Sequence, residues 1–261
     1  MKLTVTVITR NEASNIAAAL ESVSWADEII VVDSHSTDDT VAIARRRATR
    51  VEVREWPGYS AQKNLAAELA AHDWILSLDA DERVTPSLAA EIRHLLATAP
   101  SSNGYRIPRV AWYLGRWIRS TDWYPDHQLR LYNRTTGRWT ERRVHESVAV
   151  DGPVGILEHE LQHYPYRNIS HHLQTIDRYT TLAAEDWAAA GRRANAWRTF
   201  FHPRFAFLRN YILKGGFRDG SAGLIVSLLN SYYVFLKFAK LWELERGSGS
   251  GARGSGLGTP E

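Results

Sequence analysis

The sequence has no cysteine among its 261 residues. This absence excludes disulfides and thiolate metal sites, so a bound metal must use oxygen or imidazole ligands, and it fits a reducing cytosol. Long apolar runs are missing too, because no stretch reaches the roughly 18 uninterrupted apolar residues of a membrane-spanning helix. The nearest candidate, residues 224–242, contains Lys237 and Lys240 as well as uncharged polar residues. We therefore expect a protein that does not span a membrane.

Two further absences narrow the class of protein. The amino terminus does not resemble a signal peptide, because Arg10, Asn11 and Glu12 interrupt its first apolar segment. A glycine-rich phosphate loop is also missing, which counts against a Rossmann dehydrogenase or a P-loop enzyme. With 44% hydrophobic and 23% charged residues, the composition is that of an ordinary globular protein. Flexibility is expected only in the Gly/Ser-rich segment 246–261.

Negative charge is scarce in the carboxyl-terminal third of the chain. Between Tyr164 and Leu241, eleven basic residues stand against four acidic ones, an excess of seven positive charges. Aromatic residues such as Trp197, Phe200 and Phe205 alternate there with arginines. This mixture suits peripheral contact with an anionic membrane surface, although packing of the aromatic residues onto a core explains the spacing equally simply. No motif for nucleic-acid binding accompanies the charge, so no nucleic-acid partner is expected.

The first half of the chain alternates strand and helix patterns. β-branched or apolar runs predict strands at 3–9, 28–33, 50–55 and 74–79. Helical periodicity and capping residues predict helices at 14–23, 60–71 and 86–97, and a further helix that starts near Thr37, with residues 36–38 as possible caps, and ends at about Arg47. This order indicates an α/β fold with a mostly parallel sheet that is flanked by helices. Short strands rich in Trp, Tyr and Arg between 104 and 161 predict an antiparallel addition, and helices are expected at 169–190, 197–213 and 220–244.

Polar side chains follow several of these strands. Thr9 and Glu12 come after the first strand, Asp33 and Ser34 after the second, and Asp79-Ala80-Asp81 after the fourth. The carboxyl ends of parallel strands meet at one edge of the sheet, where open α/β sheets bind ligands. Asp-x-Asp alone is more often an exposed turn, and residues 36–38 can simply cap a helix. Their shared position instead favours a nucleotide pocket with a divalent cation, Mg²⁺ or Mn²⁺.

Two long segments carry a family resemblance: TVITRNEASNIAAALESVSWADEIIVVDSHSTDDTVAIA and WPGYSAQKNLAAELAAHDWILSLDADERV. Together with WYPDHQLRLYN, GRWTERRVHESV and DRYTTLAAED, they cover most of residues 3–187. The chain thus resembles the family 2 glycosyltransferases of the GT-A fold, and in particular the lipopolysaccharide core glucosyltransferases. The resemblance implies an α/β GT-A domain at 1–165, a basic and aromatic helical extension at 166–245, and the tail.

The resemblance also assigns roles to residues. Thr9, Glu12 and Asp33 match contacts to the nucleoside, with Ser34 beside them. Lys63 matches a basic residue that faces the donor. The donor-binding motif is Asp79-Ala80-Asp81, in which Asp81, with help from Asp79, is expected to hold the metal that bridges the diphosphate. Lys63 can also be read as part of a solvated helix face.

Asp126 matches the place where the family commonly has its catalytic base. Here Pro125 precedes it, whereas many relatives have an acidic residue, and Asp122 is the fallback. His145 is the expected imidazole ligand of the metal, with His159 and His163 as weaker candidates. Further basic residues that suit the diphosphate or an anionic acceptor are Arg130, Arg142 and Arg143.

The implied activity is inverting, metal-dependent transfer of a hexose, with glucose from a UDP-sugar as the expected donor. The expected acceptor is a lipopolysaccharide core or related envelope glycan at the cytoplasmic face of the inner membrane. Within the family, the alternative acceptors are a lipid-phosphate carrier, a peptide or another surface glycan. Outside catalysis, the alternative is a nucleotide-sugar-binding module without turnover, against which the intact carboxylates argue.

Overall fold

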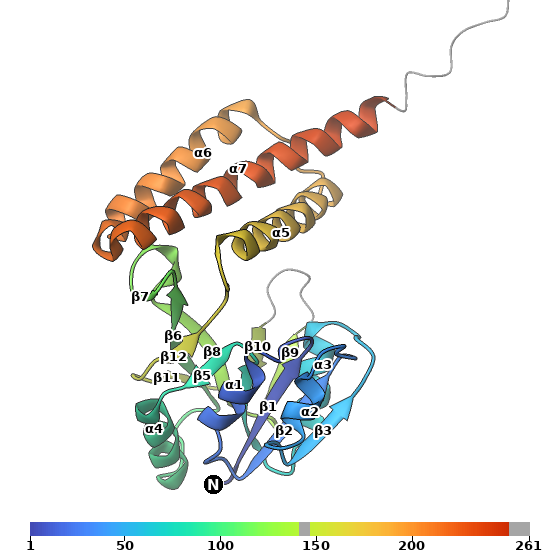
Figure 1. Ribbon diagram of the computed structural model, residues 1–261, viewed down its shortest axis with the longest axis vertical. Helices are drawn as coiled ribbons and strands as arrows, with labels where there is room; N and C mark the ends of the chain where they lie inside the picture. The colour runs from blue at the N-terminus through green and yellow to red at the C-terminus, as the bar shows by residue number, and fades with distance from the viewer. Residues whose placement is uncertain (141–146, 251–261) are drawn as a thin grey trace, which may run out of the picture. The chain divides into compact units, whose positions relative to one another are not determined.

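The computed structural model describes residues 1–140 and 147–250 (Figure 1). It divides into two compact units. The first unit consists of residues 1–112 and 124–165, and the second consists of residues 113–123 and the chain from 166 onward. The predicted boundary near residue 165 does not include residues 113–123, which belong with the helical unit.

A parallel sheet forms the centre of the first unit. Its strands run in the spatial order β3, β2, β1, β4. Their bounds are β1 (Leu3–Thr9), β2 (Glu28–Asp33), β3 (Arg50–Val53) and β4 (Trp74–Asp79). β1, β2 and β4 are almost wholly buried because helices cover both faces of a parallel sheet, so most of their residues are apolar, with buried threonines and a buried serine among them. The predicted α/β class and these strands are confirmed.

Helices cover the two faces of this sheet. They are α1 (Ile16–Ser22), α2 (Thr40–Ala44), α3 (Tyr59–Glu68) and α4 (Pro86–Ala97). Neighbouring residues of β4 point to opposite faces, so that Leu76 packs with Ile16 of α1 while Ile75 packs with Ala66 of α3 in a separate cluster. The hydroxyl of Thr85 caps α4 by accepting from the Leu88 amide at 3.2 Å.

Strands of mixed direction extend the sheet beyond β4. Their bounds are β5 (Glu82–Val84), β6 (Gly104–Tyr113), β8 (Asp126–Asn133), β11 (Val154–Ile156) and β12 (Leu161–His163). β8 runs antiparallel to both β4 and β6, which confirms the antiparallel addition. β12 then lies parallel to β6 and antiparallel to β5. The GRWT strand was wrongly placed in this sheet, because β9 (Gly137–Thr140) pairs with β10 (Ser147–Val150) as a separate ribbon.

The second unit is mostly helical. Its elements are β7 (Arg116–Ile118), α5 (Ile169–Ala189), α6 (Ala196–Leu208) and α7 (Gly220–Ser250), with a π-helical turn at Arg209–Leu213. α7 packs against both α5 and α6. A Cβ atom on Gly223 would lie 1.9 Å from the carbonyl oxygen of Gly216, so the start of α7 requires a glycine there. α7 runs to Ser250, so the predicted tail boundary at 246 was too early.

The length and composition of α7 differ from the expectation that no segment of the chain could span a membrane. Among the described residues, one helical segment, Gly216–Arg246, is long and apolar enough to cross a membrane. Only 28% of its most apolar stretch is buried within the protein. A core helix of a soluble protein satisfies the same criteria of length and composition, so this observation alone assigns α7 no place in a membrane.

Candidate active site

The strand register brings the predicted polar residues to one edge of the sheet. Thr9 lies beside Asp33 in the β1–β2 pairing, and Ile8 lies beside Asp79 in the β1–β4 pairing. The carboxyl ends of three parallel strands therefore coincide, which is the arrangement that α/β sheets use to bind ligands.

Asp33 and Ser34 are built into the turn that follows β2. The buried Asp33 carboxylate accepts hydrogen bonds from the Ser36 amide at 2.8 Å and from the Ser36 hydroxyl at 2.5 Å. The Ser34 hydroxyl accepts a hydrogen bond from Gln62 Nε2 at 2.9 Å, and the backbone amide of Ser34 donates to the carbonyl of Thr9. These contacts hold in place the turn between β2 and α2. Asp33 thus bonds within the turn, and the helix-capping alternative concerned residues 36–38 and not Asp33.

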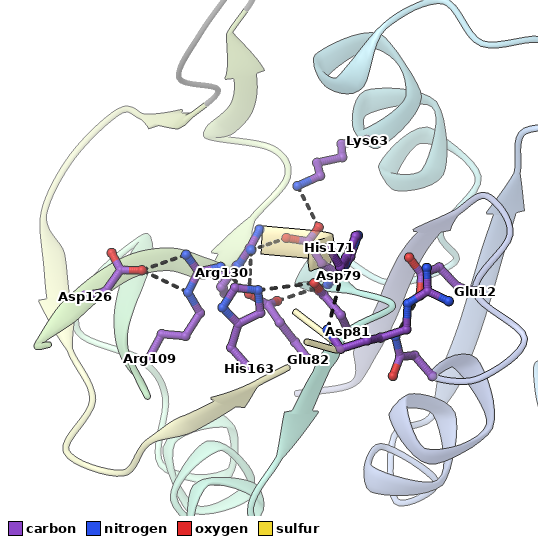
Figure 2. A network of polar contacts seen from close by, with 12 residues as sticks. Glu12, Lys63, Asp79, Asp81, Glu82, Arg109, Asp126, Arg130, His163 and His171 are labelled. Carbon is purple, nitrogen blue, oxygen red and sulfur yellow. Dashed lines mark hydrogen bonds and ion pairs between the residues drawn. The ribbon is translucent and has the colours of Figure 1, made fainter. Parts of the chain in front are cut away.

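The hydroxyl of Thr9 is a buried polar group at this edge that lacks a partner among the described residues. Thr9 is 5% exposed, and within the described residues its Oγ1 atom has no hydrogen bond. A buried hydroxyl normally has a partner, so a ligand is a natural one for this atom. Glu12 follows in the next loop, where its carboxylate accepts from Asn15 Nδ2 at 2.8 Å, and it lies to one side of the charged network in Figure 2.

Asp79 lies between two cations rather than alone. Lys63 Nζ is 2.9 Å from its Oδ1 atom, and the Arg130 guanidinium contacts its Oδ2 atom (Figure 2). Burial by itself would raise the pKa of Asp79, but the charges of Arg130 and Lys63 outweigh burial and hold this pKa well below its ordinary value. Lys63 is only 5% exposed and lies over the ring of Trp139, so the solvated-face alternative for Lys63 is wrong.

Glu82 joins this cluster to Asp126. Its fully buried carboxylate accepts from the Asp79 amide at 3.0 Å, from Arg130 at 2.7 Å and from Arg109 Nη1 at 2.9 Å. Arg109 then donates to Oδ2 of Asp126 through Nε at 2.9 Å and Nη2 at 2.6 Å (Figure 2). A continuous chain of alternating charges therefore links the motif after β4 to the first residue of β8.

The carboxylate of Asp126 keeps room for a further hydrogen bond. Its Oδ2 atom accepts twice from Arg109, while Oδ1 accepts once, from Gln128 Nε2 at 2.6 Å. Each carboxylate oxygen has about two acceptor positions, so Oδ1 can still accept from a substrate hydroxyl. Burial would raise the pKa of Asp126, but Arg109 and Gln128 lower it by more, so the group is ionised at neutral pH.

Asp81 and His163 are the donors best suited to a metal. His163 Nε2 lies 3.2 Å from Asp81 Oδ2, and both side chains are partly exposed. A carboxylate and an imidazole suit Mn²⁺, and a carboxylate suits Mg²⁺. Within the described residues no cluster of three or more such groups is present, so these two would need further ligands from a substrate or from solvent. His145, Arg142 and Arg143 lie outside the described residues. Ala80 between the two aspartates is buried.

Asp122, the fallback for Asp126, belongs to the second unit. There it pairs with Lys214 at 2.8 Å and with Arg209, and its Oδ2 atom accepts from Asn210 Nδ2 at 3.0 Å. Burial raises the pKa of Asp122, but these partners lower it further. The contacts tie residues 113–123 to the turn after α6, which accounts for a carboxylate at this position without catalysis.

Sequence reasoning missed Glu82 and Arg109 and ranked His163 below His145. Glu82 directly follows the Asp-x-Asp motif, which is the one signal that could have drawn attention to it. Arg109 and Asp126 are opposite each other in the β6–β8 register, and His163 is opposite Glu82 in the β12–β5 register. Both pairings join residues that are distant in sequence, so no local sequence pattern predicts them.

Comparison with known proteins assigns the family. The sequence model described as "Glycosyl transferase family 2" matches residues 4–150. The chain is 30% identical over 250 residues to the lipopolysaccharide core biosynthesis glycosyltransferase LpsC of Rhizobium meliloti, covering 93% of both chains. It is 32% identical over 263 residues to an uncharacterized glycosyltransferase of Rickettsia felis, covering 93% of this chain and 90% of that protein.

A solved structure supports the same fold. The mannosyltransferase PcManGT from Pyrobaculum calidifontis, determined with GDP-Man and Mn²⁺, matches 93% of this chain and 87% of its own with a TM-score of 0.54 at 19% identity. At this identity the likeness concerns the fold alone, which is the predicted GT-A arrangement. The family match covers more than half of the chain and the relatives cover nearly all of it, so the chain belongs to glycosyl transferase family 2 and is a glycosyltransferase.

Proposed function

We propose that the chain transfers a hexose, glucose from a UDP-sugar, onto a lipopolysaccharide core or related envelope glycan with inversion and with a divalent metal. One observation carries the catalytic part of this proposal. The charged chain Asp79–Arg130–Glu82–Arg109–Asp126 connects the donor motif to a carboxylate that is ionised and still able to accept a proton. The acceptor class rests on the similarity to LpsC.

The nucleoside would bind at the edge formed by β1 and β2. The Thr9 hydroxyl is a buried polar atom in need of a partner, and Glu12 and Asp33 offer acceptors for ribose hydroxyls or base N–H groups. Lys63 and Arg130 supply positive charge beside Asp79, where the diphosphate of the donor would carry its negative charge.

Asp81 and His163 would hold the metal, with Asp79 as a weaker candidate because two cations already occupy its oxygens. When bound, a divalent metal neutralises charge on the diphosphate and so makes the nucleoside diphosphate a better leaving group. His145 remains a candidate ligand from the sequence.

Asp126 would act as the base. Its Oδ1 atom takes the proton of the acceptor hydroxyl while that oxygen bonds to the anomeric carbon. The bond from this carbon to the diphosphate oxygen breaks on the opposite side, and its electron pair leaves with the nucleoside diphosphate. One proton moves to Asp126, and a new glycosidic bond replaces the bond from the anomeric carbon to the diphosphate. Because the acceptor attacks on the face opposite the leaving group, the anomeric configuration inverts.

The test is release of UDP from a panel of nucleotide sugars, with and without Mg²⁺ or Mn²⁺. Wild-type protein should release UDP only with metal, and Asp126→Asn should retain nucleotide binding but lose turnover by at least about a hundredfold. Nucleotide binding without turnover in the wild type, across the panel and with envelope glycan acceptors, would instead identify a binding module. Full activity of Asp126→Asn would remove Asp126 from the mechanism.

We further propose that the enzyme works at the cytoplasmic face of the inner membrane. This location rests on the envelope acceptor and on the basic, aromatic second unit. Sedimentation with anionic vesicles at low and high salt tests it, because electrostatic attachment weakens with ionic strength.

A further inference from the structure

The second unit contains an apolar groove between α6 and α7. Its volume is about 1100 Å³, at the upper limit of what small-molecule sites enclose. The side chains that line it are mostly aromatic or aliphatic and include Phe200, Phe207, Leu228, Tyr232, Phe235 and Trp242. Several of these are exposed to an extent that a core would not leave, since Phe200 is 52% and Leu228 50% exposed.

A hydrogen bond joins the two helices within the groove. Ser231 Oγ on α7 donates at 2.8 Å to the carbonyl of Pro203, which lies inside α6, and both residues line the groove. The helices therefore stay attached to each other while the aromatic side chains above this contact remain open. Exposed apolar surface of this extent marks an interaction site.

Basic side chains border the groove on α6. The guanidinium of Arg204 lies 3.5 Å from the centre of the Phe200 ring, and its Nη1 atom donates to the Phe200 carbonyl at 2.5 Å. These described contacts of Arg204 are with Phe200 and not with a carboxylate, so its charge is available to an anion. Arg198, nearly two turns earlier on α6, is exposed as well. An apolar cleft with the Arg204 guanidinium at its rim is complementary to a lipid, which has an apolar chain and an anionic head.

The rest of the chain offers no equivalent occupant. Residues 251–261 contain one large apolar side chain, Leu257, among glycine, serine and charged residues. α7 adds a further argument, because only 28% of its most apolar stretch is buried by the protein itself. The apolar side chains of α7 that the protein leaves exposed are stabilised by contact with another apolar medium, and the acyl chains of a bilayer supply one.

We propose that the α6–α7 groove binds an acyl chain of an anionic membrane lipid, with Arg204 facing the head group. The inference deepens the proposed envelope location by naming the partner and the surface that meets it. It requires no nucleotide sugar, so it can fail while the catalytic proposal stands, and the reverse also holds.

The test uses the full chain and vesicles of phosphatidylglycerol or phosphatidylcholine, without donor sugar. Phe235→Asp and Leu228→Asp should each weaken binding to phosphatidylglycerol vesicles by at least about tenfold, because each places a charge where an apolar chain lies. Ile156→Asp is the matched control, since Ile156 is 63% exposed on β11 of the first unit and should bind as the wild type does. Arg204→Gln should reduce the preference for phosphatidylglycerol over phosphatidylcholine.

A second measurement places the acyl chain in the groove. Vesicles with brominated acyl chains should quench tryptophan fluorescence, and Trp242→Phe should remove more of that quenching than Trp25→Phe, a replacement in the first unit. Ala239→Trp should weaken binding by filling the groove without adding charge, and circular dichroism of each variant verifies that its helices form.

Three results would overturn the proposal. Equal vesicle binding by Phe235→Asp and Ile156→Asp would show that the groove takes no part. Quenching that is unchanged by Trp242→Phe would place the acyl chain elsewhere. Self-association of the lipid-free protein that Phe235→Asp abolishes, without any vesicle binding by the wild type, would assign the groove to a second copy of the chain.

Discussion

Replacing Arg109 by glutamine should shift the pH dependence of sugar transfer. In the wild type, Arg109 makes two charge-assisted hydrogen bonds to Asp126, at 2.6 and 2.9 Å, and it is 19% exposed at the side chain. Burial raises the pKa of Asp126, and the partners Arg109 and Gln128 together lower it below the ordinary value of 3.8. His163 lowers it further by a smaller amount. Without Arg109, burial is opposed mainly by Gln128, so the pKa of Asp126 must rise.

The size of the shift follows from the same contact. An arginine beside a carboxylate typically lowers its pKa by about one to three units, which corresponds to roughly 1.4 to 4 kcal/mol. A base is active only when deprotonated, so the acid limb that Asp126 gives to kcat/KM in the wild type should lie below the ordinary pKa of 3.8. In Arg109→Gln this limb should move to higher pH, because the charge that holds the pKa of Asp126 down is gone.

The assay is kcat/KM for UDP release between pH 4.5 and 8.5 with metal at saturation. Arg109→Lys keeps the charge and should hold the limb close to its wild-type position. Arg106→Gln is a control on the same strand, because Arg106 is exposed and lies opposite Leu129 rather than Asp126. If the limb stays in place in Arg109→Gln, or moves equally in Arg106→Gln, Asp126 is not the group whose ionisation limits the reaction.

Three other predictions concern the metal and the second unit. Asp81→Ala should raise the Mn²⁺ concentration needed for half-maximal UDP release by at least about tenfold, and an unchanged titration would exclude Asp81 as a ligand. Burial lowers the pKa of His172 from 6.5 to about 4 in the folded chain. As the pH falls, this imidazole is therefore protonated in the unfolded chain before it is protonated in the folded one. The free energy of unfolding should drop between about pH 6.5 and 4 by up to roughly 3 kcal/mol. Urea unfolding should show a flatter pH dependence for His172→Phe, and an equal slope would contradict this. Gly223→Ala should destabilise the second unit by about 3 kcal/mol or more, seen as a lower urea midpoint than for Gly191→Ala in the exposed loop after α5.

The strands that position the site could be predicted from the sequence for a clear physical reason. β1, β2 and β4 are buried on both faces, so their sequences are short runs rich in apolar and β-branched residues that end in polar ones. The endpoints of those runs are also the ligand edge of the sheet, and Thr9, Asp33 and Asp79 were therefore found together with the fold. Helices were harder to delimit. A helix was expected to start near Thr37, yet α2 begins at Thr40 because Ser36 and Asp38 use their side chains on the preceding turn and the helix start.

The ion pairs that connect Asp79 to Asp126 could not be predicted from the sequence, and the register of β6 against β8 explains why. Tyr105 is opposite Leu131, but after a bulge Arg106 is opposite Leu129, so one residue of β8 has no partner on β6. Without this bulge, Arg109 would lie opposite His127 and Asp126 would lie opposite Val110. With it, Arg109 and Asp126 become direct partners on one face of the sheet. A single unpaired residue thus decides whether the carboxylate after Pro125 has a counterion. The family resemblance could point to Asp126, but only the three-dimensional register supplies the group that keeps it ionised.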